Sequence, residues 1–179
     1  MNNKTESFKE KLRQALSSTA RVISDDLGIN PKKNIKNSEK HDLIELENLN
    51  SKKDYIRARA ETDSKALKKK FSDESIFKKN LPSSSSCKSL YTITEKIRYE
   101  KLGSKMLKGI EKNLKDNYIQ MIDHKRKDQI NSKDDVPVVE AFELYMLKNF
   151  HNIKLNSLTS RMLNFWEKDF DKSIFEHIE

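Results

Sequence analysis

The sequence contains only three glycines, three prolines and one cysteine in 179 residues. So few glycines and prolines mean few turns and long elements, which favours an α-rich fold. The single cysteine, Cys87, excludes an intramolecular disulfide, and a reducing, cytoplasmic location is therefore expected. No apolar run approaches the roughly 20 residues that span a membrane, and the polar N-terminus does not resemble a secretory signal.

Motifs for common cofactor and metal sites are also missing. The sequence has no GxxxxGK[ST] loop and no GxGxxG turn after a strand, so we predict no nucleotide site. The four histidines, none with a second ligand at metal-binding spacing, are expected on exposed helices or loops: His41, His124, His151 and His177. We therefore predict no catalytic residue, no metal ligand and no cofactor on this chain.

The charge of the chain is high and unevenly spread. Charged residues make up 36% and apolar residues 35%, so the core should be modest, and the net charge is +8. Residues 51–130 carry 21 basic and 11 acidic side chains, a surplus of ten. This segment could attract an acidic protein partner or nucleic acid, although a lysine-rich composition with a solvated surface explains the same surplus.

The apolar periodicity predicts an all-α, multi-helix fold in which residues 1–179 form a single domain. A short helical turn should end at Pro82, and residues 82–88 should form a flexible connector. Residues 25–50 read as an extended polar arm or loop, and the alternation in "DLIELENL" leaves room for one short β-hairpin around 34–47. The predicted helices span residues 5–24, 52–71, 88–116, 117–130, 132–150 and 157–177.

Two glycines and an arginine mark the segment "EKIRYEKLGSKMLKG", residues 95–109. Glycine costs a helix interior about 1 kcal/mol, and arginine is scarce here, with seven against 29 lysines. We predict that helices 52–71 and 88–116 pack together, with Gly103 and Gly109 allowing close approach of the backbones.

Arginine side chains should pair with carboxylates across this contact, because the planar guanidinium accommodates bidentate pairs. Arg98 is predicted to pair with Glu61 or Asp63. Arg57 or Arg59 is predicted to pair with Glu100. An acid–base site built from Arg98, Glu100 and Asp63 is the alternative, although the sequence indicates no substrate pocket for it.

The same two segments resemble the N-terminal region of the T subunit of aerobic cobaltochelatase, the CobT family. "RAETDSKALKKKFSD" (59–73) is similar to RGxADxxALRLRxHD, and "EKIRYEKLGSKMLKGIEKNL" (95–114) is similar to ExxRxExxGxxxxxGxxxNL. Ala60 and Ser72 replace a glycine and a histidine, and lysines replace most arginines. The positions that fit the motifs are Arg59, Glu61, Asp63, Ala66, Leu67, Asp73, Glu95, Arg98, Glu100, Gly103, Gly109, Asn113 and Leu114.

The resemblance implies an accessory subunit of the ATP-dependent complex that inserts cobalt into a corrin ring in cobalamin biosynthesis. A ring-forming ATPase subunit and a large chelatase subunit would be its partners and would handle ATP, magnesium and cobalt. Family members continue through an acidic linker into a metal-binding domain that is absent from this sequence, so a docking role is expected. A basic helical nucleic-acid-binding protein is the alternative function, and homo-oligomers are compatible with either function.

The packing argument and the resemblance together define one predicted structural site, which we call the helix seam. It comprises Arg57, Arg59, Glu61, Asp63, Glu95, Arg98, Glu100, Gly103, Gly109 and Asn113.

Overall fold

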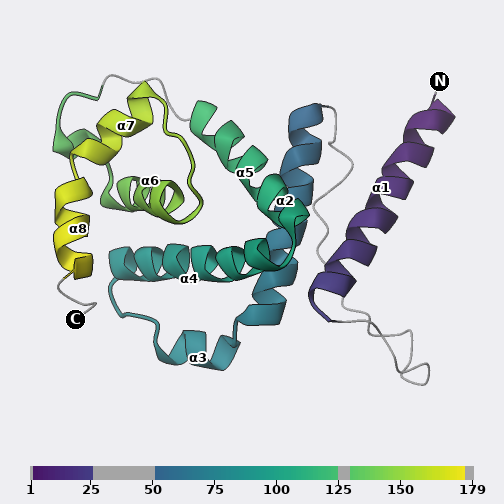
Figure 1. The fold of residues 1–179 in the computed structure, drawn as a ribbon, viewed down its shortest axis with the longest axis horizontal. Coiled ribbons are helices and arrows are strands. Elements are labelled where there is room, and N and C mark those ends of the chain that lie inside the picture. Colours follow the sequence, from purple (N-terminus) through teal and green to yellow (C-terminus); the bar gives the residue numbers. More distant parts are fainter. Residues whose placement is uncertain (1, 26–50, 125–129, 176–179) are drawn as a thin grey trace.

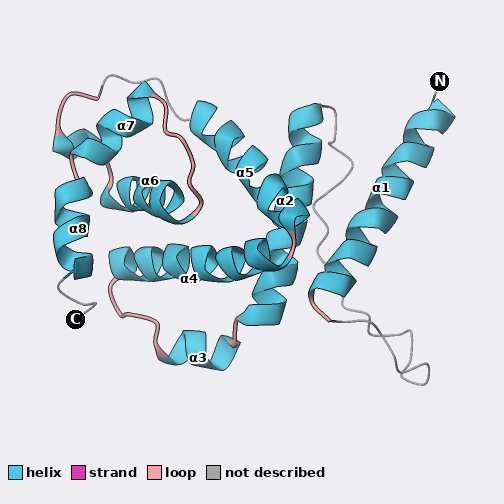
Figure 2. Ribbon diagram, viewed as in Figure 1, coloured by secondary structure: helices cyan, strands magenta, loops and turns pink. Residues whose placement is uncertain are grey.

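The computed structural model describes residues 2–25, 51–124 and 130–175. These ranges contain eight α-helices, one short 3-10 helix and no strand, which confirms the all-α prediction (Figures 1 and 2). The predicted arm and the β-hairpin around 34–47 lie outside the described residues. The elements are α1 (Asn2–Ile23), α2 (Lys52–Phe71), α3 (Glu74–Lys79), α4 (Ser85–Met106), α5 (Lys108–Asp123), η3 (Lys133–Asp135), α6 (Val138–Phe150), α7 (Ser157–Asn164) and α8 (Glu167–Phe175).

Helices α1 and α2 run parallel along one side of the molecule (Figure 1). The Phe8 and Tyr55 rings meet edge to face near the start of both helices. Lys70 and Asp25 form an ion pair near the end of both. Both contacts fit a parallel pair, in which the two helices begin at the same end.

The predicted helix over 88–116 is two helices, because the chain turns at Leu107. Leu107 is extended (φ −137°, ψ 112°), and its N–H still donates to the Gly103 carbonyl at 3.1 Å. Helix α5 then continues through the stretch that was predicted to be separate, and it ends at Asp123. The connector predicted at 82–88 is also shorter, since α4 begins at Ser85 with a bond from the Lys88 N–H to the Ser84 carbonyl.

The C-terminal helices α6, α7 and α8 form the other side of the molecule (Figure 1). The predicted helix over 157–177 is broken at Phe165 and Trp166, giving α7 and α8. The Trp166 indole N–H donates to the Val136 carbonyl at 3.1 Å, and its ring stacks on Phe170, so the break anchors α8 to the start of α6.

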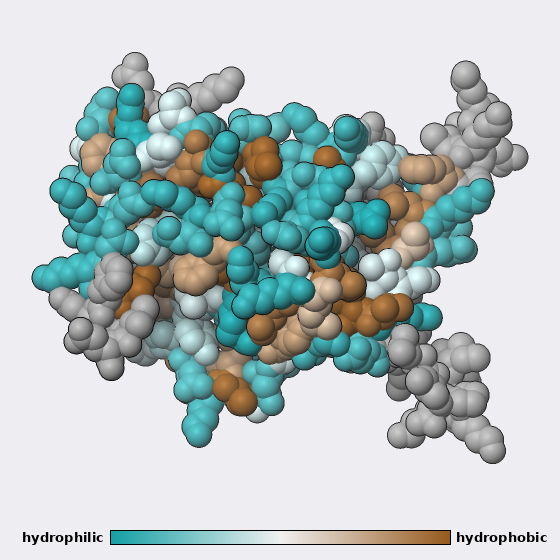
Figure 3. All heavy atoms as spheres, viewed as in Figure 1, coloured by the Kyte–Doolittle hydropathy of each residue, from teal (hydrophilic) through white to brown (hydrophobic). Residues whose placement is uncertain are grey.

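One main apolar core joins the two sides. Its largest fully buried apolar side chains come from α2, α5, α6, α7 and the intervening loops: Leu67, Leu114, Tyr118, Ile130, Val136, Leu144, Leu147, Met162 and Leu163. Hydrophilic residues cover most of the face seen in Figure 3, as the low apolar content predicts. No helix in the described ranges combines the length and the apolar character needed to cross a bilayer.

Candidate functional site

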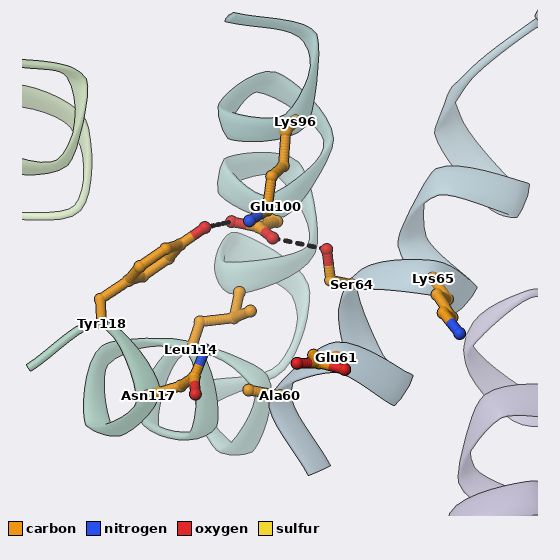
Figure 4. Close-up of a pocket in the computed structure, with 9 residues that line it drawn as sticks. All are labelled: Ala60, Glu61, Ser64, Lys65, Lys96, Glu100, Leu114, Asn117 and Tyr118. Carbon is orange, nitrogen blue, oxygen red and sulfur yellow. Dashed lines mark hydrogen bonds between the residues drawn. The ribbon is translucent and has the colours of Figure 1, made fainter. Parts of the chain in front are cut away.

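Glu100 of α4 lies at the centre of the molecule with no solvent exposure. Its Oε1 accepts a hydrogen bond from Ser64 Oγ of α2 at 2.5 Å, and its Oε2 accepts one from the Tyr118 hydroxyl of α5 at 2.5 Å. Figure 4 shows these two bonds linking three helices through one carboxyl group. The Glu100 carboxyl therefore determines how α2, α4 and α5 are aligned.

Burial dominates the ionisation of this cluster. It raises the pKa of Glu100, and the nearby Lys96 ammonium opposes the shift without cancelling it. Burial also raises the pKa of Tyr118 well above its usual value, and the Glu100 carboxylate beside it adds to this shift. Both groups thus favour their neutral forms, which a low-dielectric interior requires.

His151, which follows α6, brings a fourth element to the cluster. It is 1% exposed, so the prediction of an exposed histidine is wrong at this position. Its Nε2 lies 3.6 Å from Glu100 Oε2 and has no hydrogen-bond partner, and its ring packs against Tyr118. Burial lowers the pKa of His151 to about 4, and three lysines, led by Lys101, add to the shift, so the imidazole is neutral at pH 7.

A cavity of about 290 Å³ opens beside Glu100 (Figure 4). Its walls come from α2, α4 and α5 and carry charges of both signs. The lining residues are Ala60, Glu61, Ser64, Lys65, Lys96, Glu100, Leu114, Asn117 and Tyr118. Arg98 and Asp63 do not line it, so the three groups of the predicted acid–base alternative do not converge on one cavity.

Asp63 and Asn113 form a second buried contact, between α2 and α5. Asn113 Nδ2 donates to Asp63 Oδ2 at 2.7 Å, whereas Asp63 Oδ1 is buried without a partner. Burial raises the pKa of Asp63, with Asn113 and the Arg59 charge acting in the opposite direction. Both residues belong to the predicted helix seam, although no pairing between them was predicted.

Arg98 does not form the predicted ion pair across the two helices. Its guanidinium bonds Glu95 Oε2 at 2.7 Å and Oε1 at 2.8 Å within α4, and it donates to the Phe71 carbonyl at the end of α2 at 2.6 Å. The reason is helical geometry, because residues two apart differ by about 200° in direction. With Glu100 turned into the core, Arg98 must point outward.

The remaining predicted pairs across the seam are also wrong. Arg57 pairs with Asp54 one turn away at 3.6 Å, and Arg59 is exposed. Glu100 takes neutral hydroxyl donors in place of an arginine, since a guanidinium at this depth would have to lose its hydration. The α2–α4 contact is real, but hydroxyl groups, close packing and the Arg98 bond to the Phe71 carbonyl form it, and no ion pair between the two helices is seen among the described residues.

The two glycines differ completely in environment. A Cβ built on Gly103 would lie 2.2 Å from Leu67 Cδ2, so α2 and α4 touch at this point only because the side chain is absent. A Cβ on Gly109 would meet nothing within 4 Å, because the break at Leu107 leaves Gly109 on the exposed first turn of α5. The close-approach prediction is therefore confirmed for Gly103 and wrong for Gly109.

A mixed apolar and basic surface surrounds the turn between α4 and α5. We call it the α4–α5 corner and define it by Leu102, Lys105, Met106, Leu107, Lys108 and Lys112. Met106 is 56% and Leu107 49% exposed, which is high for large apolar side chains. No ion pair connects its lysines to another residue in the described part of the chain.

Sequence reasoning found Glu100 and Gly103 but did not identify Ser64 and Tyr118 as the partners of Glu100, or Leu67 as the residue that packs on Gly103. These partners have ordinary types at ordinary spacings, and only the folded contacts identify them. Among the described residues, no three His, Cys, Asp or Glu side chains gather closely enough to hold a metal ion.

Comparison with known proteins gives one result. The family model described as "Cobalamin biosynthesis protein CobT" matches residues 6–179. No curated protein and no solved structure matches this chain.

Proposed function

The chain belongs to the CobT family of cobalamin biosynthesis proteins, and from this premise we propose that it is an accessory subunit of cobaltochelatase that acts by docking. In this proposal the chain holds a ring-forming ATPase subunit and the large chelatase subunit together. Those partners handle ATP and magnesium and insert cobalt, the substrate metal, into the corrin ring.

The α4–α5 corner is the observation that carries this proposal. Exposed apolar side chains provide contact area on desolvation, and the lysines around them favour an acidic partner surface. The corner lies between α4 and α5, the helices that the buried Glu100 carboxyl joins through Tyr118. The motif residues of the family would then serve mainly to keep this surface rigid.

Binding of the full chain to the purified ring ATPase subunit tests the proposal. We expect binding at low ionic strength that weakens as salt is raised, because exposed charges are screened. Replacing Lys105, Lys108 and Lys112 together with glutamate should weaken binding by about 10-fold or more. Absence of binding at low salt would contradict the docking role.

A matched control separates a local effect from an effect of net charge. Lys79, Lys154 and Lys168 are exposed lysines on α3, the α6–α7 loop and α8. Replacing these three with glutamate changes the net charge by the same amount and should alter binding by about twofold at most. An equal loss in both triple variants would mean that the corner is not the contact.

Nucleic-acid binding is the second function that the same lysines could support. Filter binding to random duplex and single strands across a salt series distinguishes it from docking. Sub-micromolar affinity with a steep salt dependence would favour nucleic acid as the partner.

A further inference from the structure

The cavity beside Glu100 has one charged group of each sign that lacks a counter-ion. Lys96 of α4 and Glu61 of α2 both line the cavity and are half-buried. Neither side chain forms an ion pair with another residue in the part of the chain that the structure describes. A half-buried charge has lost part of its hydration, so a group of opposite sign placed in the cavity would stabilise each of them.

Each of these charges has a candidate partner four residues along its own helix, and neither pair forms. Glu61 and Lys65 have the favourable order for a helical ion pair, but Figure 4 shows Lys65 pointing away from Glu61. Lys96 could pair with Glu100, but both Glu100 oxygens accept hydrogen bonds from hydroxyl groups. Burial also raises the pKa of Glu100, so this carboxyl favours its neutral form and does not supply Lys96 with a full counter-charge.

The size and the remaining walls of the cavity suit a small organic molecule. Its volume of about 290 Å³ lies near the lower end of the range for ligand pockets and could hold roughly ten water-sized groups of about 30 Å³ each. Ala60, Leu114 and the Tyr118 ring supply apolar contact, and the Asn117 amide can both donate and accept hydrogen bonds. The Lys96 ammonium lies 5.3 Å from the centre of the Tyr118 ring, so the positive charge sits beside this apolar wall.

We propose that the cavity binds a small amino acid whose ammonium and carboxylate are separated by a short apolar chain. The ligand carboxylate pairs with Lys96, its ammonium pairs with Glu61, and its methylene groups lie along Ala60 and Leu114. A simple anion leaves Glu61 without a counter-ion, and a simple cation leaves Lys96 without one. A ligand that carries both charges therefore matches the cavity better than either.

Ligand-observed NMR titrations of the full chain with β-alanine, γ-aminobutyrate and δ-aminovalerate test the proposal. These amino acids differ in the separation of their two charges. At least one of them should bind with a dissociation constant of roughly 1 mM, which is reasonable for so few atoms. Butyrate and butylammonium carry one charge each and should bind at least about 10-fold more weakly than the best amino acid, because each leaves one charge of the cavity without a partner.

Two substitutions remove the charges of the cavity one at a time. Lys96→Met and Glu61→Gln should each weaken binding of the best amino acid by at least about 10-fold. Lys88→Met and Glu74→Gln are the matched controls, because both residues are exposed, lie outside the cavity and change the net charge by the same amounts. The controls should alter the dissociation constant by about twofold at most. Circular dichroism at 222 nm should show equal helix content in all four variants.

Three results would overturn the proposal. The first is that none of the three amino acids binds at concentrations up to about 20 mM. The second is that butyrate or butylammonium binds as tightly as the best amino acid, which would assign the cavity to a ligand with one charge. The third is that the control variants lose as much affinity as Lys96→Met and Glu61→Gln. These titrations use no partner subunit, so this proposal and the docking role can fail separately.

Discussion

Replacing Gly103 with alanine should destabilise the protein, although the same change stabilises an ordinary helix. The added Cβ would lie 2.2 Å from Cδ2, 2.5 Å from Cδ1 and 2.9 Å from Cγ of Leu67. Leu67 is 1% exposed, so it has no free space to move into, and such overpacking costs about 1–3 kcal/mol. The higher helix propensity of alanine offsets about 1 kcal/mol of this cost. We expect a net loss of about 1 kcal/mol in the free energy of unfolding.

In a chain in which Leu67 is replaced by alanine, Gly103→Ala should stabilise the protein instead of destabilising it. Leu67→Ala alone costs about 2–5 kcal/mol through the cavity that it leaves. In that background the Cβ at position 103 has room, and Gly103→Ala should stabilise by about 1 kcal/mol. The two sites should therefore be coupled by about 2 kcal/mol in a double-mutant cycle.

Urea denaturation followed by circular dichroism at 222 nm measures all four proteins of the cycle. Gly109→Ala is the control, since nothing lies within 4 Å of its added Cβ, and it should stabilise by up to about 1 kcal/mol. The close-contact reasoning is refuted if Gly103→Ala stabilises the wild-type chain as much as Gly109→Ala does. It is equally refuted if the coupling is near zero.

Three further predictions concern the buried polar groups. His151 has its pKa lowered to about 4, so the free energy of unfolding should fall by roughly 3 kcal/mol as the pH drops from 6.5 towards 4. Urea titrations at several pH values should show this loss in the wild-type chain and not in His151→Gln. Glu100 has a raised pKa, so its stabilising contribution should fall as pH rises above 4.5, and Glu100→Gln should flatten that slope in the same titrations. Asn113→Asp should cost about 2 kcal/mol by opposing two buried carboxyl groups, and adding Asp63→Asn should restore most of the thermal stability.

The sequence by itself determined the helical class and much of the family pattern. Scarce glycine and proline with 3.6-residue periodicity specify helices, because these are local properties of the backbone. Gly103 and Glu100 stood out for the same reason, since a glycine or a carboxylate at an otherwise apolar helical position is unfavourable unless something offsets it.

Only the tertiary structure decided which groups bind the Glu100 carboxyl and which side chain packs on Gly103. The carboxyl of Glu100 is bound by Ser64 and Tyr118, which lie 36 and 18 residues away in the sequence. Arg98 was assigned to the wrong carboxylates because its direction depends on the rotation of α4 about its axis. That rotation follows from burying Glu100 and seating Leu67 against Gly103, and neither contact is encoded in local spacing.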